Sequence, residues 1–321
     1  MRVDRGGAPA SLLILNAQEV ATAAQDLQLM EPLATALASY SSGEANCPPR
    51  TAARASQGCL GAMPSHLPGR ALAAKLISVF ASNPARGLPS HQGLLALFNE
   101  HDGNPFCVMD ARHITAFRTA AVSALAVREL GRTGASVLAI LGTGEQAAAH
   151  LRLLPKVRSF AELRIAGRNR GHLERLVGAA SEWRAYPSFE VAVRGADVVV
   201  CCTDSPQPLL RLSWLSRGAL VVSVGSGPEI DESTIRESRL FVEWRGALTN
   251  PPPAGAAELQ GLNPEVATEL GEVLAGSQPG RLSSEEVTVF KSTGLGVEGA
   301  AVGWAVYDAA VRAGLGTPVR W

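Results

Sequence analysis

The sequence predicts an α/β protein that contains a doubly wound parallel sheet, and three observations lead to this prediction. Between residues 135 and 290, continuous apolar runs alternate with helix-like segments, as expected for parallel strands that are covered on both faces. A glycine-rich turn follows the first of these runs. The residues before and after this block lack the alternation, so they predict a second, α+β domain.

The first part of the chain predicts helices at its ends and strands between them. Residues 18–40 have the periodicity of one amphipathic helix. Alanines and leucines recur at three- and four-residue spacing over 114–130, which predicts a strong helix that ends at Gly131. Three apolar runs bounded by Gly, Pro and Asn predict strands: 71–80, 93–99 and 105–110.

The middle block predicts the strand–helix alternation itself. The predicted strands lie within residues 135–142, 162–168, 191–203, 220–226 and 239–243, and the clearest helices are 145–156 and 172–183. A last helix over 294–315 does not continue the alternation. We expect it to fold back onto the first part, which makes that domain discontinuous. The predicted boundaries are therefore 1–128, 129–292 and 293–321.

Composition excludes several classes of protein. The 29 basic and 29 acidic residues balance, so there is no electrostatic reason to expect a nucleic acid or a membrane surface as partner. No apolar run reaches the ~18 residues of a membrane span, and the N-terminal apolar block is too short for a signal peptide, so we expect a cytoplasmic protein.

Cysteine and histidine usage predicts neither disulfides nor a metal. The five cysteines show no CxxC spacing, which indicates reduced thiols, and Cys201 and Cys202 end an apolar run that predicts a buried position. The six histidines do not cluster as metal ligands, so we expect no metal.

The strongest local motif is LAILGTGEQAAAH, in which Gly142, Gly144 and Ala147 have GxGxxA spacing. It follows a predicted strand and opens a predicted helix, which is the context of a Rossmann-type dinucleotide site and disfavours a simple glycine turn. The glycines permit a tight turn and close approach of a pyrophosphate, and the helix N-terminus offers N–H donors. The residues predicted to contact the cofactor in this turn are Gly142, Thr143, Gly144, Glu145, Gln146 and Ala147.

The following strand favours NADPH over NADH. NAD sites usually place a carboxylate about 20 positions after the glycines, whereas this chain has Arg168, Asn169 and Arg170 there. A guanidinium pairs with a 2′-phosphate, so Arg168 is the main candidate and Arg170 the second. Solvated loop arginines, with NADH as cofactor, are the alternative. Thr203, at the end of a later strand, is also predicted to contact the cofactor.

Three basic residues of the first part have unusual surroundings. Lys75 lies in an apolar strand, Arg118 lies on an apolar helix, and Arg50 follows two prolines. A charge at a strand edge or a helix end would explain any one of them. Together they predict a clamp for an anionic substrate, because cationic groups pair with carboxylates.

The sequence resembles the ornithine cyclodeaminase/mu-crystallin family, and within it the mu-crystallin-like ketimine reductases. The resemblance extends from about residue 48 to 310 and covers most of the chain. It rests on the stretches PPRT, GAMP, AKLISVF, GLPSHQG, VMDARHITAFRTAAVSALA, LGTGEQA, GADVVV, ELGEVLAG and VFKSTGLGVE, which occur in family order. The resemblance implies that the NAD(P)-binding Rossmann domain is inserted into a discontinuous α+β substrate and dimerisation domain, and that two copies form a homodimer by joining their sheets.

The resemblance also assigns roles to residues. Arg50, Lys75 and Arg118 match positions that hold the substrate carboxylate, and Thr119 matches a cofactor-contacting position. His91 matches a position that lines the site, although a histidine satisfied within its turn fits the sequence equally well. Lys291 and Ser292 match the segment near the nicotinamide.

One departure from the family pattern bears on the reaction. Cyclodeaminases carry a VGAD-like motif whose aspartate is the acid/base, whereas this chain has VVSVGSGPEID, with Gly227 at that position. Glu229 would replace the aspartate only if the backbone rearranges. Without a base, the enzyme cannot readily deprotonate an amino acid's ammonium group, but an iminium accepts hydride directly.

These features predict NADPH-dependent reduction of a small cyclic ketimine, of the 1-pyrroline-2-carboxylate or 1-piperideine-2-carboxylate type. The nearest alternative is an open-chain dehydrogenase that acts on an amino acid or an N-alkyl amino acid. In the reducing direction its substrate is an imino or keto acid. An ornithine cyclodeaminase and a non-catalytic, crystallin-like binding protein are less favoured.

Overall fold

The computed structural model describes residues 11–25, 27–225 and 227–321, and the chain divides into two compact units. The first unit contains the described residues up to Pro32, together with Glu44–Thr115 and Gly296–Trp321. The second contains Leu33–Gly43 and the described residues of Ala116–Leu295. The first unit is therefore built from both ends of the described chain.

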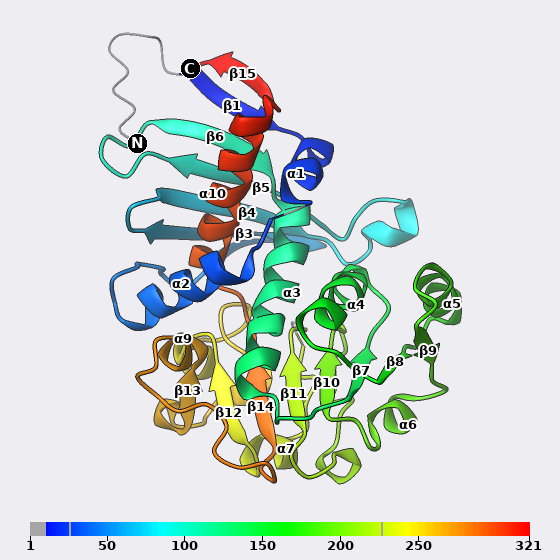
Figure 1. Ribbon diagram of the computed structural model, residues 1–321. Helices are drawn as coiled ribbons and strands as arrows, with labels where there is room; N and C mark the ends of the chain where they lie inside the picture. Colours follow the sequence, from blue (N-terminus) through cyan, green and yellow to red (C-terminus); the bar gives the residue numbers. More distant parts are fainter. Residues whose placement is uncertain (1–10, 26, 226) are drawn as a thin grey trace. The chain divides into compact units, whose positions relative to one another are not determined.

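The first unit contains a seven-stranded mixed sheet of order β15-β1-β6-β5-β4-β3-β2. Its strands are β1 (Ser11–Leu15), β2 (Thr51–Ala55), β3 (Gly58–Leu67), β4 (Ala71–Val79), β5 (His91–Phe98), β6 (Pro105–Asp110) and β15 (Thr317–Arg320). The short helices α1 (Ala17–Ala24) and η1 (Asn83–Arg86) belong to this unit, and α10 (Gly296–Ala313) packs against β3, β4 and β5 (Figure 1).

Alternation along the strands gives this sheet two different faces. Met63, Lys75 and Leu95 are cross-strand neighbours on β3, β4 and β5, and all three are buried on the side that contacts α10. On the other side, four large apolar side chains are each at least two-fifths exposed. They are Ile14, Leu60, Leu72 and Leu94, and we call this side the exposed sheet face.

The second unit contains an eight-stranded parallel sheet of order β13-β12-β14-β11-β10-β7-β8-β9. Its strands are β7 (Val137–Leu141), β8 (Glu162–Ala166), β9 (Trp183–Ala185), β10 (Val198–Cys201), β11 (Leu220–Ser223), β12 (Arg239–Val242), β13 (Ala267–Glu269) and β14 (Thr288–Lys291). The chain runs outward from β7 in one direction through β8 and β9, and in the other through β10 and β11. The carboxyl ends of β7 and β10 thus flank the topological switch point, where such sheets bind nucleotides.

Helices connect these strands. They are α4 (Glu145–Val157), α5 (Arg170–Ala179), α6 (Phe189–Val193), α7 (Glu232–Arg236), α8 (Gly246–Thr249), α9 (Leu270–Leu274), η2 (Leu212–Trp214), η3 (Ala257–Leu259) and η4 (Pro264–Val266). Two further helices, α2 (Met30–Ser41) and α3 (Ala111–Leu130), begin with residues of the first unit and continue with residues of the second.

The predicted fold class is confirmed, and two element predictions are wrong. Residues 18–40 form α1 and α2 rather than one helix, because the connecting segment also carries half-buried leucines that extend the periodic pattern. The helix predicted over 172–183 ends at Ala179, and Trp183 instead begins β9, where it pairs with Leu163 and is 1% exposed.

The boundaries between the two compact units differ from the domain boundaries predicted from the sequence. The units change at residues 115/116 and 295/296, whereas the predicted domain boundaries follow residues 128 and 292. Most of α3 is assigned to the second unit, because Ser123 bonds His150 and the Leu130 carbonyl accepts from Arg281. The boundaries of the functional domains stay a prediction.

Three further observations concern membrane spans, metal binding and the cysteines. In the part of the chain that the structure describes, no helix is long and apolar enough to cross a membrane. Among the same residues, no group of three His, Cys, Asp or Glu side chains is placed to hold a metal ion. All five cysteines are free thiols, and Cys201 and Cys202 are buried as predicted.

Candidate functional site

The glycine-rich turn joins the buried strand β7 to α4. Gly142 has φ +133°, and a Cβ there would lie 2.4 Å from the Cys202 carbonyl oxygen, so only glycine fits. A Cβ on Gly144, the N-cap of α4, would meet no atom within 4 Å, whereas Ala147 is fully buried. The turn therefore offers open space at a helix N-terminus whose N–H groups suit a pyrophosphate.

The loop after β8 carries the predicted 2′-phosphate site. A Cβ on Gly167 would lie 2.3 Å from the Thr143 methyl group, so this loop packs against the glycine-rich turn. Arg168 is 70% exposed and forms an ion pair of 3.3 Å with Asp204, which follows β10. Asn169 caps α5 by accepting from the His172 N–H, and Arg170 is the exposed first residue of that helix.

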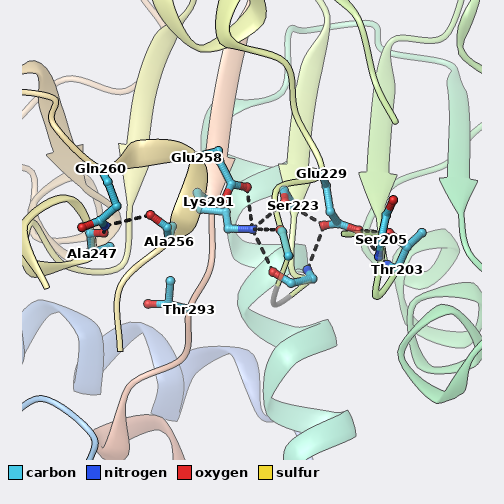
Figure 2. Close-up of polar contacts among 12 residues, drawn as sticks. Thr203, Ser205, Ser223, Glu229, Ala247, Ala256, Glu258, Gln260, Lys291 and Thr293 are labelled. Carbon is cyan, nitrogen blue, oxygen red and sulfur yellow. Dashed lines mark hydrogen bonds and ion pairs between the residues drawn. The ribbon is translucent and has the colours of Figure 1, made fainter. Parts of the chain in front are cut away.

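Glu229 joins the loops that follow β10 and β11 (Figure 2). Its side chain is fully buried, and one carboxylate oxygen accepts from the N–H and hydroxyl of Thr203 at 2.6 and 2.7 Å. The other oxygen accepts from the Ser223 hydroxyl at 2.7 Å and the Gly225 N–H at 2.8 Å. Four donors stabilise this carboxylate, so it fixes two loops at the carboxyl edge of the sheet.

Lys291 extends this network from the end of β14. Its ammonium is 2% exposed and donates to the Ser223 hydroxyl at 3.0 Å and the Gly225 carbonyl at 2.8 Å. It also pairs with the buried carboxylate of Glu258 at 2.8 Å. Gln260 holds the turn that carries Glu258 by donating to two backbone carbonyls (Figure 2).

Ser292 begins a turn that Glu243 holds. The Ser292 hydroxyl donates to Glu243 Oε1 at 2.6 Å, and the N–H groups of Thr293 and Gly294 both donate to Glu243 Oε2. Gly294 in turn lies against the guanidinium of Arg118, which is 6% exposed on α3.

A buried polar chain links α3 to α4 behind the glycine-rich turn. Thr119 is 5% exposed, and its carbonyl oxygen lies 2.9 Å from the Ser123 hydroxyl. Ser123 is also 2.8 Å from Nε2 of His150, whose Nδ1 is 2.8 Å from the Gln146 carbonyl. The Gln146 carbonyl can only accept, so Nδ1 of a neutral imidazole carries the proton and Nε2 accepts from the Ser123 hydroxyl, whose single proton is then not available to the Thr119 carbonyl. Burial lowers the pKa of His150 to about 4, which favours this neutral form.

In the first unit, Lys75 and Arg50 lie near the first turn of α10. Lys75 is 3% exposed, and its Cδ is 3.9 Å from where a Cβ on Gly299 would lie. The Gly296 N–H donates to the Cys47 thiol at 3.1 Å. Burial raises the pKa of that thiol, and the charges of Glu298 and Arg50 also act on it. The structure thus brings two members of the predicted clamp to one end of this helix.

His91 does not join them within this sheet. It is exposed at the start of β5, four residues from Leu95, the neighbour of Lys75, and its Nδ1 lies 3.0 Å from the Ser90 hydroxyl. The contact with Ser90 lies within the turn, and the site-lining role of His91 stays a prediction. Arg118, Thr119 and the predicted cofactor residues all belong to the second unit.

Several polar residues of the site were not predicted from the sequence: Asp204, Ser223, Glu243 and Glu258. Asp204 and Glu243 each occur just after a buried strand, a position that signals the functional edge of a parallel sheet. Glu258 lies in a short helical turn and carries no such signal.

Comparisons with known proteins give a consistent result. A model described as the ornithine cyclodeaminase/mu-crystallin family matches residues 11–314. The ketimine reductase mu-crystallin of Mus musculus is 36% identical over 291 residues, which cover 87% of this chain and 91% of that protein.

Two solved structures are similar over nearly the whole chain. The Delta(1)-pyrroline-2-carboxylate reductase of Thermococcus litoralis, in complex with NADH and L-proline, has a TM-score of 0.88 at 28% identity and covers 96% of this chain and 100% of its own. An archaeal alanine dehydrogenase dimer with bound NAD has a TM-score of 0.87 at 28% identity, covering 97% and 99%.

Proposed function

This chain belongs to the ornithine cyclodeaminase/mu-crystallin family as an NAD(P)-dependent oxidoreductase that acts on an imine or amino acid, and we propose that it reduces a small cyclic ketimine carboxylate with NADPH. The preferred substrates are of the 1-pyrroline-2-carboxylate or 1-piperideine-2-carboxylate type. The similarity to a ketimine reductase and to a pyrroline-2-carboxylate reductase supports this choice.

The observation that carries the proposal is the space around Gly227. A Cβ at this position would lie 2.1 Å from the Ser205 carbonyl oxygen, so the loop has no room for the aspartate that a cyclodeaminase uses. Glu229 is not a substitute, because four donors already occupy its carboxylate. A site without this acid/base suits an iminium substrate, which requires no deprotonation before hydride transfer.

The proposed mechanism assigns three tasks to the protein. Arg50, Lys75 and Arg118 bind the substrate carboxylate and align the imine carbon. The glycine-rich turn and Arg168 hold the cofactor, and Glu229 and Lys291 fix the loops beside it. The chemistry that bound NADPH supplies is hydride donation.

The proton on nitrogen has three candidate sources. It arrives with the iminium substrate, it comes from Lys75 in a desolvated site, or it comes from water that His91 organises. NADH is the alternative cofactor, since the similar solved structures contain NADH or NAD.

The test is a kinetic panel with purified enzyme. We expect rapid oxidation of NADPH with a cyclic ketimine and slower oxidation of NADH. Turnover only with a keto acid and an added amine would instead support the alanine dehydrogenase-like alternative, which the second solved structure favours. Binding of NADPH without turnover of any compound would contradict an enzymatic role and support a binding protein.

Replacing Arg118 with alanine tests the clamp. The loss of a charge-assisted bond to a carboxylate is expected to lower kcat/KM by about tenfold to more than a hundredfold. Arg128→Ala is the matched control, because Arg128 lies on the same helix with an exposed side chain that pairs with Glu129. Full activity of the Arg118→Ala enzyme with every ketimine would show that the anchoring role is wrong.

A further inference from the structure

We propose that Glu243 and Gly294 set the orientation of the Arg118 guanidinium, and that they are therefore positioning residues for the substrate carboxylate. The proposal rests on the proposed function, in which Arg118 binds that carboxylate. Neither residue would touch the substrate itself. They act through the turn that follows β14.

Glu243 fixes this turn from the neighbouring strand. It follows β12, is 1% exposed, and accepts three hydrogen bonds from consecutive residues, namely the Ser292 hydroxyl and the N–H groups of Thr293 and Gly294. Trp244 adds a bond of 2.9 Å from its indole N–H to the Thr293 hydroxyl. β12 and β14 are neighbouring parallel strands, so the residues that follow β12 lie beside this turn. Their hydrogen bonds hold the turn through both its side chains and its backbone.

Gly294 then supplies a flat surface for the guanidinium. Its φ is +80°, a conformation that L side chains rarely adopt, and a Cβ there would lie 2.5 Å from Nη1, 2.5 Å from Nη2 and 2.8 Å from Cζ of Arg118. All three of the nearest atoms thus belong to the guanidinium. The guanidinium therefore occupies the space that any side chain at 294 would fill.

This contact matters because a guanidinium binds a carboxylate through a rigid fork. Two parallel N–H···O bonds require the plane of the fork to coincide with the plane of the carboxylate. A shift of about 1 Å in such a group can lower the rate by a factor on the order of a hundred. The turn that Glu243 holds therefore determines whether Arg118 is presented in a binding orientation.

The experiment compares Gly294→Ala with a matched glycine variant. Gly276 has φ +73°, but a Cβ there would meet no atom within 4 Å, so Gly276→Ala carries the backbone strain without the collision. We expect both variants to lose thermal stability through this strain, and Gly294→Ala to lose more because of the collision. Only Gly294→Ala should raise KM for the ketimine, by about tenfold or more, with a smaller change in kcat and an unchanged Kd for NADPH.

Two further variants link the effect to Arg118. Gly294→Ala should have little additional effect in an Arg118→Ala background, because the residue through which it acts is already absent. Glu243→Gln keeps the shape of the side chain but turns its amide NH2 toward groups that are themselves hydrogen-bond donors, so the turn is held less firmly and KM for the ketimine should rise. Equal KM values for Gly294→Ala and Gly276→Ala, or additive effects with Arg118→Ala, would overturn the proposal.

Crystal structures of the wild-type enzyme and Gly294→Ala separate this proposal from the proposed function. A displaced guanidinium supports the positioning role even if the wild-type enzyme reduces no ketimine, an outcome that would refute only the function. An unmoved guanidinium in the variant overturns the positioning role whatever the substrate.

Discussion

Arg168, the residue proposed to bind the 2′-phosphate, has an anionic neighbour. Asp204 lies 3.3 Å away, and both side chains are largely exposed. A 2′-phosphate at Arg168 would compete with this carboxylate for the guanidinium and would be repelled by it. The exposed pair would therefore reduce the preference for NADPH that we propose for this arginine.

We predict that Asp204→Asn tightens NADPH binding by about two- to fivefold, since exposed ion pairs contribute roughly 0.2–1 kcal/mol. NADH affinity should stay the same, because NADH carries no 2′-phosphate. Fluorescence titration of both cofactors measures this difference. Asp308→Asn is the charge-matched control, since Asp308 pairs with Arg312 on α10 in the first unit. Equal tightening of both cofactors would contradict the assigned role of Arg168.

At the scale of residues, the sequence predicted two of the buried cations, but not what binds the buried anions. Lys75 and Arg118 stand in apolar segments, and both are less than one-tenth exposed. Glu229 receives its donors from Thr203, Ser223 and Gly225, and these partners come together only when neighbouring strands align. Such pairings depend on strand order, which local sequence does not encode.

The contact of α3 with α4 depends on a buried neutral histidine. The His150 pKa falls from 6.5 to about 4 because burial penalises the charged ring. Above pH 6.5 the ring is neutral in both the folded and the unfolded chain. As pH falls toward about 4, the unfolded chain binds a proton that the folded chain does not, so the folded state loses stability.

We predict that this histidine contributes about 3 kcal/mol to the loss of unfolding free energy between pH 6.5 and about 4. His150→Gln lacks this contribution, so the stability gap between the wild-type protein and this variant should narrow over that range. Urea unfolding across the range measures the gap. His172→Gln is the control, because His172 is exposed on α5. A gap that stays constant with pH would show that His150 is not held neutral by the fold.

At the scale of elements, prediction succeeded where burial alone determines the pattern. The strands β7, β10 and β11 are covered on both faces, and their continuous apolar runs were identified from the sequence. Residues 11–15 contain the short N-terminal apolar block, for which the sequence predicts no strand. They form β1, which pairs with β6 on one side and β15 on the other. The pairing of strands from opposite chain ends leaves no local signal.

At the scale of the whole molecule, the exposed sheet face predicts self-association. Monomers rarely expose large contiguous apolar patches, and this face presents the four apolar side chains defined above. The family resemblance implies a dimer joined through these sheets, and the similar alanine dehydrogenase is a dimer. We propose that a second copy of this chain covers the face.

We predict that Leu72→Asp shifts the protein from dimer toward monomer, because a charge on this face would be desolvated on association. Light scattering coupled to size-exclusion chromatography measures the molar mass. Leu282→Asp is the matched control, since Leu282 is 65% exposed and belongs to the second unit. An unchanged mass for Leu72→Asp, or a wild-type monomer, would refute this interface.

The return of the chain to its first unit has a consequence for biosynthesis. The ribosome completes the whole sequence of the second unit, through Leu295, before it makes α10 and β15. Without α10, the strands that carry Lys75 and Leu95 lack the helix that covers them, and β1 lacks one of its two neighbours. Domains fold as units while the chain emerges. The nascent protein therefore contains the complete parallel sheet before the sheet of the first unit is complete, and the proposed substrate clamp forms only after α10 has been made.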